Sequence, residues 1–206
     1  MKKENNNSQK LKLSTALFKG SFIYNPILTQ VIGICPIVGA ATTFKNALVL
    51  SLVLSITLIF CEVISSLALK KVERNIRVCL YCLFASVPTL LSSAIMSDKT
   101  LSALGIFLPL LSVNAIIVIR CEKFAVKTSV RNSFLDSIAS SLGFSAVAVV
   151  VGFLRELLSY GSVFSLKISS LPVFSAFALP FGGLVVLGFL AAAHKGIVMK
   201  FFPDEL

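Results

Sequence analysis

The sequence predicts an all-α integral membrane protein with six transmembrane helices, arranged as two inverted three-helix repeats. Three observations lead to this fold class: the composition, the length of the apolar runs, and a matched pair of glycine and proline interruptions. Of the 206 residues, 56% are hydrophobic and 14% are charged. This leaves too little polar surface to solvate a soluble globule of this size, so we expect the chain to lie in a lipid bilayer.

The apolar runs are long enough to cross the bilayer, whose hydrocarbon core of about 30 Å requires about 20 apolar residues in a helix. Six runs meet this requirement, at 22–43, 46–69, 78–96, 101–119, 134–158 and 173–193. They use most of the chain, so no independent soluble domain is expected. We predict a basic cytoplasmic leader over 1–20 and a single membrane domain over 21–206, with the repeats at about 21–97 and 98–198.

The positive charge is distributed unevenly along the chain. The net charge of +10 would suggest nucleic-acid binding in a soluble protein, but here the basic residues follow the membrane topology. They concentrate in the leader, in 70–77, in 120–131 and in the tail, and the opposite side receives only Lys45, Lys99, Arg155 and Lys167. The positive-inside rule then predicts both termini in the cytoplasm of a bacterial cell, with the chain in the inner membrane. No nucleic-acid partner is expected.

Glycine and proline interrupt the first and the fourth apolar runs at corresponding positions. Gly33 and Pro36 lie in the first run, and Gly105 and Pro109 lie in the fourth, where Asn114 is a further candidate residue of the interrupted helix. Irregular backbone at membrane depth survives where it is buried in protein or lines a site, and paired interruptions are typical of inverted-repeat transport proteins. We therefore predict a functional midplane at these breaks. The alternative is a simple proline kink in each helix.

Two residues within the predicted spans carry potential chemistry. Cys35 lies in the first interruption, where free backbone amides would tune the potential of an iron–sulfur centre. One thiol cannot hold a cluster, so this role needs a partner chain, and a small buried packing residue is the alternative. Glu62 lies in the second run, where a carboxyl is costly and is a candidate either for an ion path or for an interhelix hydrogen bond.

The remaining polar residues favour structural roles. Cys79 and Cys82 share a helix face and are interpreted as packing residues, and Cys61 adjoins Glu62 without an assigned role. Arg155 and Glu156 are expected to form a local pair or an interfacial anchor. Asp136 is expected to cap the start of the fifth span. No nucleotide-binding loop or nucleophile motif is found, so no catalytic residue is assigned and the chain is not expected to catalyse a reaction alone.

Three stretches resemble a known family. They run from Asn25 to Pro36, from Asn114 to Ala125 and from Ser133 to Ser162. In order and spacing they are similar to the E-subunit family of the Rnf electron transport complex and to its relative, the D subunit of the sodium-translocating NADH:quinone oxidoreductase. The similarity extends from residue 25 to about residue 195.

The resemblance implies a subunit of a ferredoxin:NAD⁺ oxidoreductase of the Rnf type, which couples electron transfer to Na⁺ or H⁺ translocation. Such a subunit pairs with a homologous, oppositely oriented A subunit, in a complex that also holds the B, C, D and G subunits. The two membrane subunits share a 2Fe–2S centre, with two cysteines from each. Cys35 matches the first family cysteine, whereas Ala115 stands at the second and Ile119 replaces a glycine. The flavin-attachment motif of the sister subunits is absent, so no flavin is expected in this chain.

Cys121 is the alternative candidate for the missing ligand. Six residues along a helix correspond to about 9 Å and roughly 600° of rotation. Cys121 can therefore replace the family cysteine, whose place Ala115 takes in this chain, only if the helix is broken between the two positions. Two interpretations therefore stay open. The chain contributes Cys35 to a cluster with an unusual ligand set, or it is a cluster-free transporter or scaffold subunit of the same fold.

Overall fold

The computed structural model describes residues 27–29, 32–163, 166–167 and 175–201. The predicted leader and part of the first predicted span, residues 22–26 and 30–31, lie outside the described residues. The elements, in chain order, are α2 (Ile34–Ala40), α3 (Phe44–Ala68), α4 (Arg74–Ile95), α5 (Asp98–Leu104), α6 (Phe107–Leu110), η2 (Leu111–Val113), α7 (Ala115–Arg120), the π-helical turn η3 (Cys121–Ala125), α8 (Val130–Tyr160), β1 (Ser162–Val163), β2 (Leu166–Lys167), η4 (Ser175–Ala178) and α9 (Pro180–Phe201).

The membrane class predicted from composition is confirmed for the part of the chain described above. Four helices are long and apolar enough to cross a membrane: α3, α4, α8 and α9. A fifth candidate is the broken element that joins α5 to the stretch 107–125 with a bend of 66°. Large apolar side chains cover the outside of the bundle, among them Ile95 at 86% and Phe189 at 76% exposed. An outward-facing apolar surface of this kind suits lipid rather than water.

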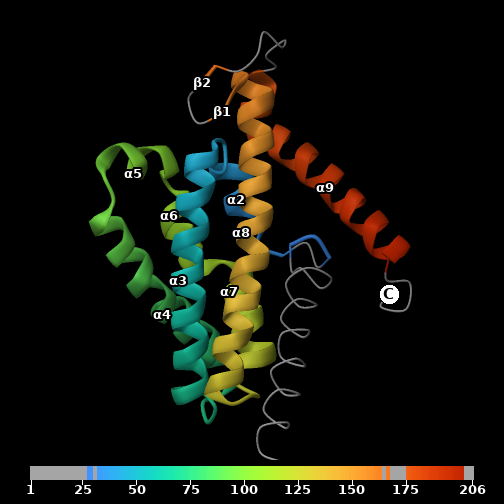
Figure 1. Cartoon of the computed structure of the whole chain (residues 1–206). Coiled ribbons are helices and arrows are strands. Elements are labelled where there is room, and N and C mark those ends of the chain that lie inside the picture. Colours follow the sequence, from blue (N-terminus) through green and yellow to red (C-terminus); the bar gives the residue numbers. More distant parts are fainter. Residues whose placement is uncertain (1–26, 30–31, 164–165, 168–174, 202–206) are drawn as a thin grey trace, which may run out of the picture.

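The antiparallel pair α3 and α8 forms the centre of the bundle (Figure 1). The two helices approach closely because small residues face each other along their contact. A Cβ atom added to Gly152 would lie 2.6 Å from the Cβ of Ala47, and Ser55 Oγ lies 3.5 Å from Ser145 Oγ. Small residues at helix crossings are the usual solution for packing within lipid, where apolar burial alone does not drive association.

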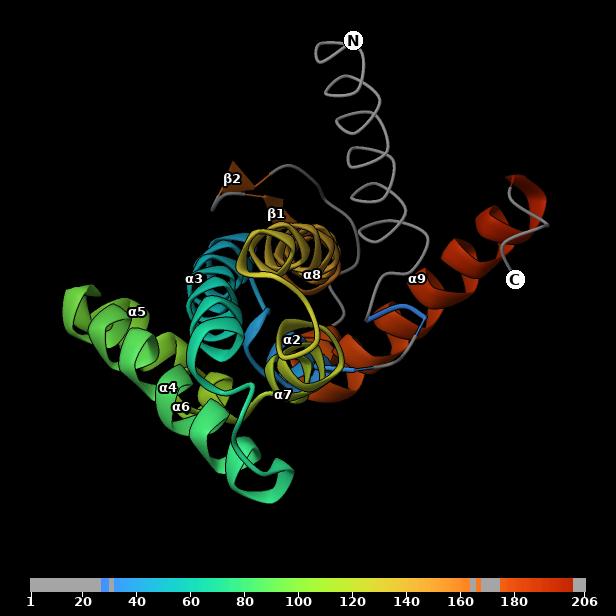
Figure 2. The same ribbon diagram turned by 90° about the horizontal axis from the view of Figure 1, so that it is seen from below.

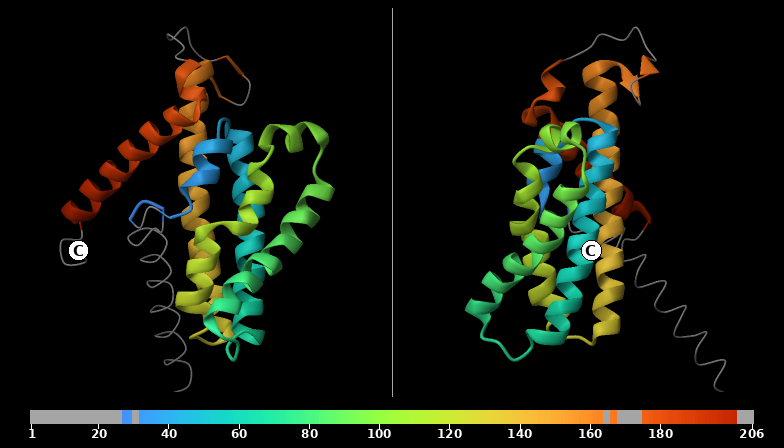
Figure 3. Two further views of the ribbon diagram at one scale, coloured as in Figure 1. Left: turned by 180° about the vertical axis from the view of Figure 1, so that it is seen from behind. Right: turned by 90° about the vertical axis from the view of Figure 1, so that its left-hand side faces the viewer.

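The other elements surround this pair unevenly. Seen along the bundle, α2 and α7 pack beside α3 and α8, while α4, α5 and α6 lie on one flank (Figure 2). Helix α9 leaves the bundle obliquely on the opposite flank from α4, as the view from behind shows (Figure 3). A two-stranded hairpin, with Val163 paired to Leu166, follows the end of α8. Gly161 ends α8 in the left-handed conformation, at φ 59°, which glycine adopts without steric cost.

Candidate functional site

Half-helix α2 begins at the first predicted interruption. Gly33 is its N-cap and has φ 77°, a left-handed conformation that favours glycine. Pro36 is buried in the first turn of α2, where its missing amide hydrogen costs no helical hydrogen bond. Cys35 lies in the same turn and is exposed on the surface of the chain. The described chain is therefore not helical at residues 32–33 and is helical from Ile34 onward, and the Cys35 thiol is accessible to a neighbouring protein.

A second half-helix, α7, begins at Asn114. The Asn114 side chain acts as the N-cap, since its Oδ1 accepts a hydrogen bond from the amide of Ile116 over 3.2 Å. Asn114 is only 6% exposed, and its Nδ2 has no hydrogen-bond partner among the described residues. Asparagine is well suited to this position because its short amide replaces the backbone acceptor that an intact helix would supply.

The two breaks meet inside the molecule. A Cβ atom added to Gly33 would lie 3.0 Å from Asn114 Oδ1 and 3.4 Å from the Cβ of Ile116. The starts of α2 and α7, which are far apart in sequence, are therefore in contact. Ala115, the position that corresponds to the family's second cysteine, is the first residue of α7 and is exposed.

The fourth run is interrupted at two points, and the one that contacts Gly33 is not at the predicted glycine or proline. Gly105 ends α5 with φ 49° and marks the 66° bend. Pro109 lies in the first turn of α6, where it is compatible with a helix. The break that touches Gly33 is instead at Asn114, because an asparagine cap ends the preceding 3₁₀ turn and starts α7.

The cysteines separate clearly by exposure. Cys121 is fully buried in the π-helical turn η3, at the far end of α7 from Ala115. Cys61 is also buried, and its thiol points to the backbone oxygen of Tyr81 at 3.9 Å. Cys79 is exposed and Cys82 is partly buried on α4. Among the described residues, no three His, Cys, Asp or Glu side chains gather closely enough to hold a metal ion.

These positions can be tested against the ligand set of a 2Fe–2S centre. Such a centre needs four ligands, mostly thiolates, and this chain offers one exposed thiol beside the meeting point of α2 and α7. Cys35 fits as one ligand of a cluster whose other ligands come from outside the described residues. Cys121 is buried within the chain, so its thiol does not face a position that a second membrane protein could share.

Arg155 holds the opposite end of α2. The predicted local pair with Glu156 is wrong, because the guanidinium instead donates to backbone oxygens of two other segments. Arg155 is fully buried, and its acceptors are the oxygens of Ile37, Val38, Ala41, Phe177, Ala178 and Leu179, at 2.8–3.4 Å. The cation therefore donates hydrogen bonds to backbone oxygens at the end of α2 and at the end of η4, just before α9.

The side chain of Glu156 binds the N-terminus of α3. Its Oε2 accepts a hydrogen bond from the amide of Phe44, the first residue of α3, over 2.8 Å. A carboxylate at a helix N-terminus is favoured by the partial positive charge there. Arg155 and Glu156 thus hold the two sides of the short turn between α2 and α3.

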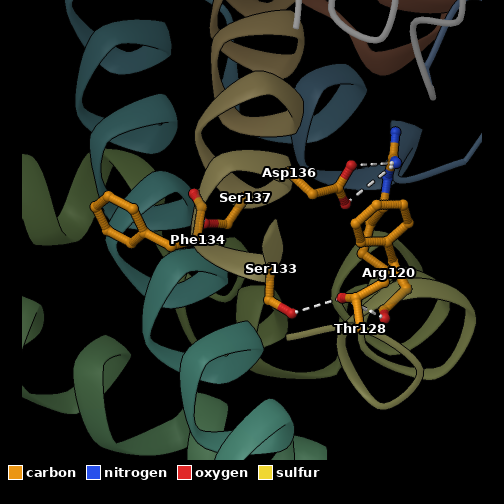
Figure 4. Close-up of polar contacts among 7 residues, drawn as sticks. Arg120, Thr128, Ser133, Phe134, Asp136 and Ser137 are labelled. Carbon is orange, nitrogen blue, oxygen red and sulfur yellow. Dashed lines mark hydrogen bonds and ion pairs between the residues drawn. The ribbon is translucent and has the colours of Figure 1, made fainter. Parts of the chain in front are cut away.

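A charged pair links α7 to α8 (Figure 4). Arg120 Nη1 lies 3.2 Å from Asp136 Oδ1, and both side chains are less than one fifth exposed. The predicted capping role of Asp136 is wrong, since α8 begins earlier, with Ser129 as its N-cap. Below this pair, Ser133 Oγ lies 3.0 Å from Thr128 Oγ1.

A second polar cluster joins α4 to η3 and was not predicted. The fully buried Tyr81 donates its hydroxyl hydrogen to Glu122 Oε2 over 2.9 Å. Arg77 Nε lies 3.6 Å from the same oxygen. The residues are about forty positions apart in sequence, so no local pattern indicates the cluster.

Glu62 lies fully buried on α3. Neither of its carboxyl oxygens has a hydrogen-bond partner within the described residues. Of the two roles left open by the sequence, an interhelix hydrogen bond is therefore not formed here.

The long apolar helices, the lipid-suited surface and the two broken helices that meet beside α3 and α8 define a multi-pass membrane protein. The chain belongs to the Rnf-Nqr family of membrane subunits, which it matches over residues 13–191. The family resemblance found in the sequence is thereby confirmed.

Individual relatives give the same result. The E subunit of the ion-translocating oxidoreductase complex from Vibrio cholerae serotype O1 is 35% identical over 205 residues, covering 90% of this chain and 88% of that protein. The corresponding E subunit from Shewanella frigidimarina is 38% identical over 157 residues, covering 74% of this chain and 68% of that protein. The D subunit of the Na⁺-translocating NADH-quinone reductase from Pseudoalteromonas translucida is 31% identical over 183 residues, covering 85% of both proteins.

Proposed function

We propose that this chain is a membrane subunit of an ion-translocating oxidoreductase complex of the Rnf type, and that it acts only together with partner subunits. The observation that carries the proposal is the contact between Gly33 and Asn114, which brings two half-helix starts together beside the exposed Cys35. The names of the relatives supply the activity class, since they are subunits of ion-translocating oxidoreductases.

In this proposal Cys35 contributes one thiolate to a 2Fe–2S centre shared with the homologous A subunit of the complex. Such a centre supplies one-electron transfer when bound. The role of this chain is to present the Cys35 thiol at the meeting point of α2 and α7 and to hold α2 in place through Arg155. The exposure of Cys35 supports a shared site, because a thiol buried within the chain could not reach a partner.

The full fold in this proposal has six spans in two inverted repeats, with Na⁺ or H⁺ as the transported ion. The connections from α3 to α4 and from α7 to α8 lie at one end of the bundle, and those from α4 to α5 and from α8 to β1 lie at the other (Figure 1). Lys70, Lys71, Arg74, Lys123 and Lys127 belong to the first end. By the positive-inside rule this end faces the cytoplasm of a bacterial inner membrane, together with both termini.

Orientation can be tested with cysteines introduced at the two ends of the bundle. Lys71→Cys and Lys99→Cys are made in a chain whose native cysteines are replaced by serine. A membrane-impermeant maleimide added to spheroplasts should label the cysteine at position 99. The cysteine at position 71 should be labelled only after the spheroplasts are lysed. Labelling of position 71 from outside would reverse the proposed topology.

The absence of the second family cysteine favours a second candidate function. With Ala115 in that place, the chain would be a cluster-free transporter or a scaffold of the same complex. Transport by the purified chain alone in liposomes supports the transporter, and no transport without partners supports a role within the complex.

Electron paramagnetic resonance of the dithionite-reduced complex, purified through this chain, tests the leading proposal. The wild-type complex should show a 2Fe–2S signal that is lost or shifted in Cys35→Ser. Cys79→Ser is the matched control, since Cys79 is equally an exposed thiol but lies on α4, and it should leave the signal unchanged. Cys121→Ser shows whether the buried thiol takes part. A wild-type complex without this signal would favour the cluster-free candidate.

A further inference from the structure

The buried carboxyl of Glu62 is the least explained polar group in the described part of the chain. Its side chain is fully buried, and both oxygens lack a hydrogen-bond partner among the described residues. Burial of a polar group without a hydrogen-bond partner is unfavourable, because nothing replaces the water molecules that it loses. A carboxyl with only a packing role would be satisfied by a neighbour or replaced by an apolar side chain.

The register of α3 against α8 locates the surroundings of this carboxyl. Ser55 and Ser145 face each other across the two antiparallel helices, and Ala47 faces Gly152. Because both helices rise by about 1.5 Å per residue, these two pairs place Glu62 on α3 level with residues 137–138 of α8. Less than one helical turn further along α8 is Ser140, whose buried hydroxyl oxygen also has no partner among the described residues.

The charges around Glu62 come from two neighbouring elements. Asp136 on α8 and Arg120 on α7 form an ion pair at 3.2 Å, and both act electrostatically on Glu62. The thiols of Cys61 and Cys121 are the other titratable neighbours, on α3 and η3. The Arg120–Asp136 pair is neutral overall, so an ionised Glu62 beside it requires one further monovalent cation for local charge balance.

We propose that Glu62 binds one exchangeable monovalent cation, H⁺ or Na⁺, between α3 and α8, with Ser140 as a neighbouring oxygen ligand. This inference rests on the proposed function, because it assigns the binding group for the ion that the complex transports. The unpartnered oxygens of Glu62 and Ser140 serve as its ligands, and the Arg120–Asp136 pair sets the charge balance. The site lies within the membrane-spanning part of the chain, in the half of α3 that is nearer the proposed cytoplasmic side.

Chemical labelling of the whole complex in a lipid bilayer tests this site. Dicyclohexylcarbodiimide reacts with protonated carboxyl groups within membranes, and peptide mass spectrometry identifies the modified residue. We expect modification of Glu62 and not of Glu122, whose carboxylate accepts a hydrogen bond from Tyr81 and forms an ion pair with Arg77. Protection by Na⁺ but not by K⁺ identifies Na⁺ as the bound ion, whereas modification that is independent of Na⁺ identifies H⁺.

Ion flux in proteoliposomes gives the second measurement. In Glu62→Gln, cation uptake driven by electron transfer should fall to the background leak, while Glu62→Asp retains part of it. Glu73→Gln is the control, since Glu73 is exposed at the start of α4, and it should transport like the wild type. Wild-type flux in Glu62→Gln would overturn the site.

The two proposals fail in different ways. If the wild-type complex moves no cation while Na⁺ still protects Glu62 from modification, the proposed translocase function is wrong and the cation site stands. If the wild-type complex moves cations and Glu62→Gln does so equally well, the function stands and the site is wrong.

Discussion

The guanidinium of Arg155 donates a hydrogen bond to the backbone oxygen of Val38 over 2.8 Å, across 117 positions of sequence. This bond is one of six through which a buried cation holds the end of α2 and the segment before α9. The neighbouring residue, Glu156, holds the start of α3. Two adjacent residues of α8 thus set the position of α2, the short helix that carries Cys35.

Replacement of Arg155 by lysine should destabilise the protein. The planar guanidinium of arginine donates hydrogen bonds to both segments at once. A lysine ammonium, with three donors on a flexible side chain, cannot reach both sets of backbone oxygens. We expect the free energy of unfolding to fall by about 3 kcal/mol, because buried carbonyl groups lose their donors. Thermal denaturation of the detergent-solubilised protein measures the change. Arg131→Lys, at an exposed site at the start of α8, should have little effect, and equal losses at the two sites would contradict the structural role.

Gly33→Ala should disturb the meeting of the two half-helices. The left-handed φ of 77° destabilises an alanine at this position by about 1 kcal/mol or more relative to glycine. The alanine Cβ would also lie 3.0 Å from Asn114 Oδ1. The matched control is Gly188→Ala in α9, where a Cβ meets nothing within 4 Å. Alanine should stabilise that helix by roughly 0.5–1 kcal/mol. Opposite shifts of the melting temperature are therefore expected, and a gain in both variants would argue against the close contact.

Gly39 and Phe107 should be energetically coupled. A Cβ at Gly39 would overlap the ring of Phe107, which packs on α2 from α6. Gly39→Ala alone should cost about 1–3 kcal/mol through overpacking. In combination with Phe107→Ala this cost should largely disappear, because the obstructing ring is removed. A double-mutant cycle on unfolding free energies measures the coupling, and additive effects would show that the two residues are not in contact.

Tyr81→Phe should loosen the attachment of α4 to the π-helical turn. The hydroxyl of Tyr81 is bonded to Glu122 at 2.9 Å inside the protein, so its removal should cost about 1.5 kcal/mol. Tyr160→Phe provides the control, because Tyr160 is 52% exposed at the end of α8. Urea or thermal unfolding in detergent compares the two variants. A loss at position 160 as large as that at position 81 would contradict a specific bond.

Much of the candidate site could be anticipated from local patterns. Gly33 and Pro36 are predicted to interrupt a helix, and a left-handed glycine with a first-turn proline is what the structure contains. The counterpart in the fourth run is harder to identify. Pro109 is compatible with the short helix α6. The break that contacts Gly33 depends instead on the capping hydrogen bond from the Ile116 amide to the Asn114 side chain, which forms only in the folded backbone conformation.

The roles of the buried charged residues could not be predicted, because their partners are distant in sequence. Arg155 and Glu156 are adjacent and of opposite charge, which suggests a local pair. On a helix, however, consecutive side chains point in different directions. Each therefore bonds to another segment, Arg155 to α2 and Glu156 to α3.

The sequence by itself determined that this is a membrane protein of the Rnf-Nqr family, because hydropathy and family motifs are properties of short stretches. The tertiary structure alone decided that Gly33 meets Asn114, that Arg155 satisfies the end of α2, and that Glu62 lies buried without a hydrogen-bond partner among the described residues. These relationships depend on how α3 and α8 pack, since that packing brings together groups that are far apart along the chain and excludes the solvent that would otherwise satisfy them.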